Sequence, residues 1–389
     1  MFDCSSLYSA NSGGKKRTYV ELGKRGVAGI RLSGEKINGS TIAYLSRQLY
    51  FITHNYKKAC RGIVIYCEKF VPADKLTYIL FEAYTYGYEV RLGWGDMSTA
   101  INTEGLSDST IPKLSFYLQN QELYQRKFHF EQNERHFRRV FTSDQLKGDG
   151  VSKLLGDLKI FFLTSNITKK NTDQLALVIS ELADNVGDHT DADCLLDVDI
   201  SKDFYTRDDD ETGKYIAVNT VVLNFSPKCL GHDIKEKVRN HYYKESARYD
   251  AIQEAYENHK QHFDKNYDEQ DFFNVVSFQD LITGRKGDTQ TGGTGLTQLI
   301  KSLGKNAAEH SCYVLSGNRG IAFYPELLEY NADNWIGFNQ QKNFIDHIPD
   351  EKVIFRSPTQ LCGTGYNFTL VYRREKDELY GETANSVTV

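Results

Sequence analysis

The sequence predicts an α+β fold in two parts: a small N-terminal α/β domain over residues 15–105 and a larger C-terminal α/β sandwich over residues 151–380. Three observations lead to this prediction. Apolar strand patterns alternate with amphipathic helix patterns in the first part, whereas long helices are followed by groups of strands in the second. The 389 residues of the chain are also enough for two domains with substantial cores.

The N-terminal domain is expected to have the order β-β-α-β-α-β, after a disordered segment of small polar residues at 1–14. Its strands are expected at 18–23, 27–34, 61–67 and 88–94, and its helices at 40–58, capped by Ser40, and at 73–87. These residues contain no phosphate loop, nucleophile elbow or metal-ligand spacing. We therefore expect a scaffold, regulatory or interaction domain, joined to the second part by a helical connector at 106–150.

The C-terminal domain is expected to be a mixed sheet with helices on one face. Its helices are expected at 152–163, 172–190, within 231–272 and, after a glycine turn, within 292–305. Its strands are expected at 193–200, 215–225, 311–317, 320–325 and 365–375. Because this order lacks a βαβ repeat, the helices should form a layer against the sheet.

Composition argues against several classes of function. The formal net charge of −5 does not suit a chain built to neutralise nucleic-acid phosphates, and Arg135, Arg138 and Arg139 are expected to form a solvated helix face. The seven cysteines include no CxxC pair and indicate neither a disulfide framework nor a zinc site. No apolar run approaches the ~20 residues of a membrane span, and the first residues lack a signal-peptide pattern. We expect a soluble cytoplasmic protein without a membrane partner.

The segment ELADNVGDH, residues 181–189, carries the first chemical pattern. On a helix, an apolar stripe is formed by Leu175, Ile179, Leu182 and Val186. A different face carries Glu181, Asp184, Asn185 and Asp188. Like charges this close repel by roughly a few tenths of a kcal/mol per pair, and a bound Mg²⁺ with nucleotide phosphates would offset that repulsion. The alternative is a solvated acidic face.

The segment TGGTGL, residues 291–296, carries the second pattern and precedes the helical run TQLIKSL. Glycines let the backbone approach a phosphate closely, and a helix N-terminus offers unpaired N–H groups and a positive dipole end. The segment lacks the GK[ST] ending of a P-loop and the βαβ unit of a Rossmann fingerprint. The alternative is an ordinary turn into a helix.

Together the patterns occur in one order: Glu181-x-x-x-Asn185, the strand VVLNF, a long variable stretch, GGTGL before a helix, and GTGYNFTL on a late strand. This order resembles the GHKL superfamily, the Bergerat-fold ATPases and kinases that include gyrase, heat-shock chaperones, histidine kinases and MutL. The resemblance covers residues 150–375. It implies a Bergerat-type sandwich that binds ATP and Mg²⁺ beneath a lid formed by residues 226–291.

The resemblance also implies a role for each matching residue. Asn185 would ligate Mg²⁺, and Glu181 would activate the attacking water, a task suited to a carboxylate beside a metal. The other positions expected to bind ATP are Asp188, Asn224, Gly292, Gly293, Thr294, Gly295, Leu296 and Thr364. Of these, the glycine turn would wrap the phosphates and Thr364 would lie near the adenine.

One position departs from the family. The family strand ends in an Asp that accepts a hydrogen bond from the adenine amino group, whereas this strand ends in Asn224, followed by Phe-Ser-Pro-Lys rather than spaced glycines. An Asn oxygen can still accept that bond, but it carries no charge and must be oriented by its neighbours. The departure therefore bears on adenine selectivity and on turnover.

Three functions are consistent with the sequence. The leading hypothesis is a slow ATP hydrolase that acts as a nucleotide-driven switch and passes its state to a protein partner through the lid or the N-terminal domain. Homodimerisation is plausible by analogy only. The second hypothesis is a protein kinase of the histidine-kinase or anti-sigma type, with His129 or His136 as acceptor, although His136 is expected to be an ordinary surface residue. The third is a non-hydrolysing ATP-binding module, which Asn224 favours.

Overall fold

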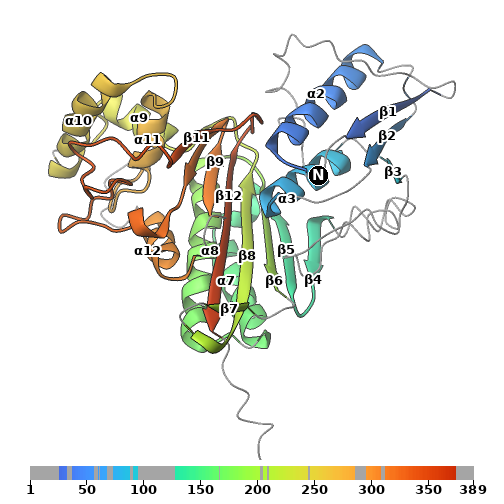
Figure 1. Cartoon of the computed structure of the whole chain (residues 1–389), viewed down its shortest axis with the longest axis horizontal. Coiled ribbons are helices and arrows are strands. Elements are labelled where there is room, and N and C mark those ends of the chain that lie inside the picture. The colour runs from blue at the N-terminus through green and yellow to red at the C-terminus, as the bar shows by residue number, and fades with distance from the viewer. Residues whose placement is uncertain are drawn as a thin grey trace, which may run out of the picture.

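The computed structural model describes residues 26–32, 37–56, 60, 62–67, 73–87, 91–94, 128–165, 167–201, 205–207, 210–243, 246–284, 295–307 and 312–373. The expected disordered segment at 1–14 and the expected strand at 18–23 lie outside them. The described residues have the predicted α+β fold, in which helices pack on a large sheet (Figure 1). Among them, no helix is both long enough and apolar enough to cross a membrane.

The large sheet has nine strands in the described part of the chain, in the order β11-β10-β9-β12-β8-β6-β5-β4, with β7 paired to the start of β8. The strands are β4 (Phe130–Gln132), β5 (His136–Phe141), β6 (Cys194–Ile200), β7 (Tyr205–Arg207), β8 (Asp210–Asn224), β9 (Tyr313–Ser316), β10 (Arg319–Ala322), β11 (Ile354–Arg356) and β12 (Thr364–Arg373). Every described pairing in it is antiparallel, so the expected mixed sheet was wrong. Sequential strands such as β9 and β10 are joined by short turns, and a short turn reverses the chain direction.

One face of the sheet is covered by α7 (Gly150–Thr164), α8 (Lys169–His189) and α12 (Gly295–Asn306) (Figure 1). α8 begins where the Thr168 side chain accepts a hydrogen bond from the Asn171 backbone N–H. Its predicted apolar stripe is buried, with exposed fractions of 0 to 3 % for Leu175, Ile179, Leu182 and Val186. Burial of this stripe fixes the rotation of α8 about its axis and so fixes where its polar face points.

The N-terminal residues form a separate three-stranded parallel sheet. Its elements, in chain order, are β1 (Val27–Leu32), α2 (Gly39–Asn55), β2 (Gly62–Cys67), α3 (Lys75–Gly87) and β3 (Arg91–Trp94). The order agrees with the prediction for the described residues. The expected cap was wrong by two residues, because the side chain of Asn38, not Ser40, accepts the hydrogen bond from Thr41 N that begins α2.

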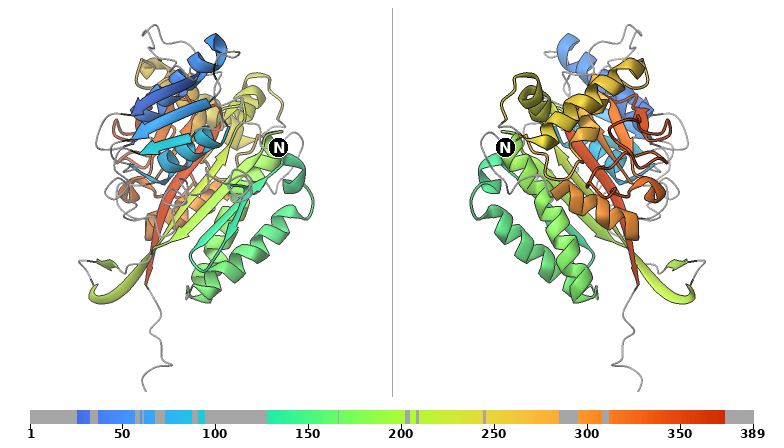
Figure 2. Two further views of the ribbon diagram at one scale, coloured as in Figure 1. Left: turned by 90° about the vertical axis from the view of Figure 1, so that its right-hand side faces the viewer. Right: turned by 90° about the vertical axis from the view of Figure 1, so that its left-hand side faces the viewer.

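α3 packs on the face of the large sheet opposite α8, so the two parts of the chain share buried surface (Figure 2). Leu76 and Phe81 of α3 lie in one apolar cluster with Leu195 of β6 and Leu223 of β8. The Leu76 backbone N–H also donates to Asn367 Oδ1 of β12 at 3.0 Å. The N-terminal domain is therefore built onto the sheet.

The connector expected at 106–150 is not helical over most of its described part, residues 128–150. β4 and β5 form a hairpin there that extends the sheet beyond β6, and a short helix, α6 (Ser143–Leu146), follows. Successive residues of β5 point to opposite faces of the sheet. Phe137 lies in the core beneath the helices, whereas Arg138 faces α3. Arg138 is 1 % exposed in β5, Arg139 lies in the same strand and Arg135 lies in the bend before it, so the expected solvated helix face was wrong.

Most of the expected lid is a helical subdomain (residues 232–276) that packs beside β10 and β11 (Figure 1). Its helices are α9 (His232–Arg239), α10 (Ala247–His259), the 3₁₀ turn η1 (Lys260–His262) and α11 (Glu269–Val276). Outside this subdomain, a second 3₁₀ turn, η2 (Pro325–Leu327), begins the loop from β10 to β11. Phe272 and Phe273 are buried in the main core. Asp271 accepts two hydrogen bonds from Arg356 of β11, at 2.5 and 2.8 Å. These contacts pack the subdomain against the core and β11.

Candidate functional site

One pocket on the helix-covered face of the sheet gathers most of the residues singled out in the sequence. It lies between the C-terminal half of α8, the start of α12 and the adjoining ends of β8 and β12, and residues 228–234 and 282–284 complete its walls. Its cavity volume is about 230 Å³, a little below the ~300–1000 Å³ that is typical of pockets for small molecules. The predicted residues that line it are Glu181, Asn185, Asn224, Gly295, Leu296 and Thr364.

α8 contributes the polar wall of the pocket. Glu181, Asp184 and Asn185 line it, as their position opposite the buried stripe predicts. Asp188 is exposed and does not line the pocket, so its placement does not fit the expected role in ATP binding. At that end of the helix His189 lines the pocket instead, because the pocket turns there toward residues 228–233.

Gly295 begins α12 directly against α8. A Cβ atom at this position would lie 2.9 Å from Glu181 Oε2 and 3.1 Å from Glu181 Cβ, so glycine allows the close approach of the two helices. The first turn of α12 has backbone N–H groups without intrahelical partners, which suit an anion. Gly292, Gly293 and Thr294, also predicted to wrap the phosphates, lie outside the described residues.

Asn224 and Thr364 meet at the floor of the pocket, where they are partners in the β8–β12 register. Asn224 Oδ1 accepts hydrogen bonds from Thr364 N at 3.1 Å and Ser226 N at 3.3 Å. Gly363, which precedes Thr364, has φ +145°, and a Cβ there would overlap the Asn224 carbonyl oxygen. The glycine before Thr364 is therefore required by the close approach of β8 and β12 at this point.

Three residues at one end of the pocket were missed in the sequence. Lys228 Nζ lies 3.2 Å from both Asp233 Oδ1 and the His189 carbonyl oxygen. His189 Nδ1 lies 3.4 Å from Asp233 Oδ2. Hydrogen bonds from His189 and then Lys228 lower the pKa of Asp233. Proximity of Lys228 to Asn224 in the chain was the available signal, but its pairing with His189 joins segments that sequence spacing does not relate.

The helical subdomain holds the wall at residues 282–284. The Thr283 carbonyl oxygen accepts hydrogen bonds from Lys237 Nζ of α9 at 3.2 Å and from the Tyr249 hydroxyl of α10 at 2.8 Å. A Cβ on Gly284 would lie 2.7 Å from Asp233 Cβ, so this wall also packs tightly on α9. The position of the wall therefore depends on α9 and α10.

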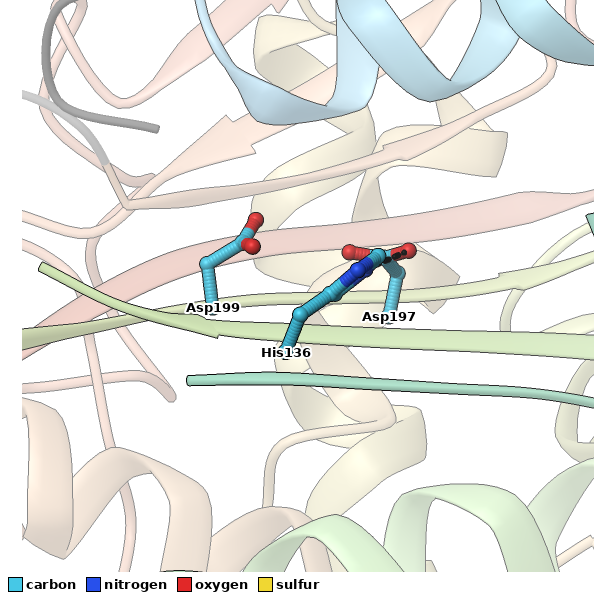
Figure 3. Close-up of side chains that lie close together, drawn as sticks. All are labelled: His136, Asp197 and Asp199. Carbon is cyan, nitrogen blue, oxygen red and sulfur yellow. Dashed lines mark hydrogen bonds and ion pairs between the residues drawn. The ribbon is translucent and has the colours of Figure 1, made fainter. Parts of the chain in front are cut away.

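A second group of titratable side chains lies on the other face of the sheet. His136 Nε2 of β5 is 2.9 Å from Asp197 Oδ2 of β6, and Asp199, also in β6, brings a carboxylate oxygen within 4.8 Å of them (Figure 3). Lys75 of α3 pairs with both aspartates, and Arg138 pairs with Asp197. Burial lowers the pKa of Lys75 to about 8, although the Asp197 charge opposes that change. Because the Lys75 ammonium already bridges the carboxylates, these residues do not form an open metal centre.

Of the two candidate phospho-acceptor histidines, His136 does not fit that role. His136 is 2 % exposed in β5, so the expectation of a surface residue was wrong; its neighbours Asp197 and Arg138 are also buried. His129 is half-buried, and burial lowers its pKa. His136 lies on a strand and not on a helix, whereas His129 lies in a helical stretch of which only Phe128 and His129 are described.

These observations define an α+β protein with a pocket between the helix layer and the end of the sheet. Comparison with family models, with curated proteins and with solved structures gives no match for the chain.

Proposed function

We propose that the chain is a cytoplasmic Mg²⁺-dependent nucleotide-binding protein that hydrolyses a nucleoside triphosphate slowly and acts as a conformational switch. ATP is the nucleotide that the GHKL resemblance implies. The observation that carries the proposal is the convergence of predicted residues from four separate segments on one pocket: Glu181, Asn185, Asn224, Gly295, Leu296 and Thr364. Each pattern alone has an ordinary structural alternative, but those alternatives do not require the patterns to meet.

The triphosphate is proposed to lie where α12 begins. The backbone N–H groups at the start of α12 and the absence of a side chain at Gly295 favour a close contact with phosphate oxygens. Asn185 and Asp184 line the pocket beside that turn and offer the oxygen ligands that Mg²⁺ prefers. Mg²⁺ held by these residues would neutralise phosphate charge.

Glu181 is proposed to accept the proton of the attacking water. Its carboxylate is half-buried and lies next to Gly295, beside the position proposed for the terminal phosphate. A general base must lie within hydrogen-bond reach of the water that it activates, which this position allows.

The switch is proposed to act through β12. Thr364 and Tyr366 of this strand line the pocket. Gly365, between them, faces the N-terminal domain, and a Cβ there would lie 3.0 Å from Leu76 Cδ1. A shift of β12 on nucleotide binding would therefore be transmitted to α3 by direct packing. A protein partner bound to the N-terminal domain or the helical subdomain, or a second copy of the chain, would sense that shift.

The test is incubation of the full chain with Mg²⁺ and γ-labelled ATP or GTP. The nucleoside diphosphate that is released and the label that is retained on the protein are then measured. Release without retained label supports hydrolysis, and retained label supports the protein kinase. Saturable binding without either supports the non-hydrolysing module. Absence of binding by both nucleotides refutes the proposed function.

A further inference from the structure

The side chain of Asn224 has a fixed orientation in the pocket. It is 6 % exposed and lines the pocket floor. Its Oδ1 atom receives two backbone N–H groups, those of Thr364 and Ser226. A carboxamide oxygen has two lone pairs, so both of its acceptor positions are filled.

The reverse orientation of this amide is unfavourable. Exchanging Oδ1 and Nδ2 would direct the NH₂ group at two backbone N–H donors, and no hydrogen bond could form with either. The backbone of Thr364 and Ser226 therefore fixes which atom faces them. Nδ2, a pure donor, is left on the pocket side.

No described residue accepts a hydrogen bond from Asn224 Nδ2, although the residue is more than nine-tenths buried. Nδ2 keeps contact with the open pocket, so a ligand that displaces water there must present an acceptor or leave this donor unpaired at a cost in free energy. A ligand in the pocket can provide that partner if it presents an acceptor. At Asn224 the pocket therefore offers a hydrogen-bond donor, whereas the Asp carboxylate that the GHKL family has at this position only accepts.

We propose that the pocket selects a 6-oxopurine nucleotide, with guanine or hypoxanthine as the base, over an adenine nucleotide. The inference rests on the proposed function and names its substrate class. The C6 carbonyl oxygen of an oxopurine accepts from Nδ2, whereas the C6 amino group of adenine would place donor against donor. The Thr364 hydroxyl, 2.9 Å from Ser316 Oγ, can donate to Ser316 and accept the N1–H group of an oxopurine.

The test compares ATP, ITP and GTP with the full chain in the presence of Mg²⁺, by calorimetry. ATP and ITP differ only at the C6 substituent and the N1 proton, so their comparison isolates the group that faces Asn224. A buried donor left unpaired typically costs ~1–3 kcal/mol, which corresponds to roughly a 5- to 150-fold difference in Kd. We expect ITP and GTP to bind at least about tenfold more tightly than ATP.

Asn224→Asp should reverse this order, because one carboxylate oxygen keeps the contacts with Thr364 and Ser226 while the other becomes an acceptor in the pocket. Asn266→Asp adds the same charge at an exposed residue outside the pocket and should leave the order unchanged. If wild-type protein binds ATP as tightly as ITP and GTP, or more tightly, the inference is overturned while the proposed function stands. If none of the three binds, both are overturned. The wild-type comparison alone decides the matter should Asn224→Asp fail to fold.

Discussion

His259 should make the stability of the helical subdomain sensitive to acid. The residue is 1 % exposed at the end of α10. Its Nε2 lies 2.8 Å from the Phe344 carbonyl oxygen and its Nδ1 lies 2.6 Å from the Tyr267 hydroxyl. A carbonyl oxygen only accepts, so Nε2 carries the proton and Nδ1 accepts from Tyr267. A second proton on Nδ1 would make the Tyr267 hydroxyl the acceptor, and the hydroxyl proton would then lose its present partner.

The direction of the effect follows from proton binding in the two states. Burial lowers the pKa of His259 to about 4, although the hydrogen bond to Phe344 opposes the change, whereas the unfolded value is 6.5. Between these pH values the unfolded chain binds a proton that the folded chain does not, so stability falls as the pH drops below 6.5. The full effect is about 3 kcal/mol, and about 2 kcal/mol is lost between pH 8 and pH 5.

Urea denaturation at pH 8 and pH 5 measures this loss. Trp335 stacks on Phe344 at 5.5 Å and is one of two tryptophans, so in a Trp94→Phe background its fluorescence reports on this region. His259→Gln removes the titrating group and should reduce the pH-dependent loss by about 2 kcal/mol. His262→Gln removes an exposed histidine in the adjoining turn and should retain the wild-type loss. Equal losses in wild type and His259→Gln would refute the assignment to His259.

The remaining predictions concern the pocket. Asn185→Ala should abolish Mg²⁺-dependent nucleotide binding in calorimetry while the protein stays folded, and Asp188→Ala, on the same helix but outside the pocket, should bind as wild type; equal affinity in both variants would remove the metal assignment. Glu181→Ala should keep nucleotide affinity within a few-fold and reduce turnover by ~10²–10⁴-fold in a phosphate-release assay; wild-type turnover in this variant would show that another group activates the water. Gly295→Ala should weaken binding because its Cβ would push the start of α12 away from α8 and keep the backbone from the phosphates, whereas Gly304→Ala, whose Cβ meets only ordinary contacts, should not; the same ligand-induced rise in Tm in both would contradict the close-contact role of Gly295.

Helical periodicity was sufficient to predict α8 and most of the pocket wall that it forms. The buried stripe sets the helix rotation, and Glu181 and Asn185 then face the pocket. An α-helix turns by about 100° per residue, which places Asp188 on the same face as Glu181 and Asn185. Its exposure depends on where the pocket turns, which is set by Lys228 in a distant segment.

Partners from distant segments account for the larger errors. Arg138 in β5 was predicted to lie on a solvated helix. A buried arginine needs carboxylate partners, and those of Arg138 come from distant segments, Asp197 in β6 and Glu82 in α3. Neither partner can be identified from the spacing of RHFRRVF. The orientation of Asn224 was likewise hidden, since it is set by backbone atoms of Thr364 on another strand.

The buried ionic cluster between α3 and the large sheet has a consequence for how the chain unfolds. Separating α3 from the sheet would break the Lys75 and Glu82 pairs with Asp197 and Arg138 and would expose Leu195 and Leu223 to water. Detachment returns these charges to water, which offsets much of the lost pairing, so the opposing free energy comes mainly from exposing the apolar side chains of this cluster. The two parts should therefore melt cooperatively in a single calorimetric transition, and a protease that cuts between residues 95 and 127 should leave both fragments associated.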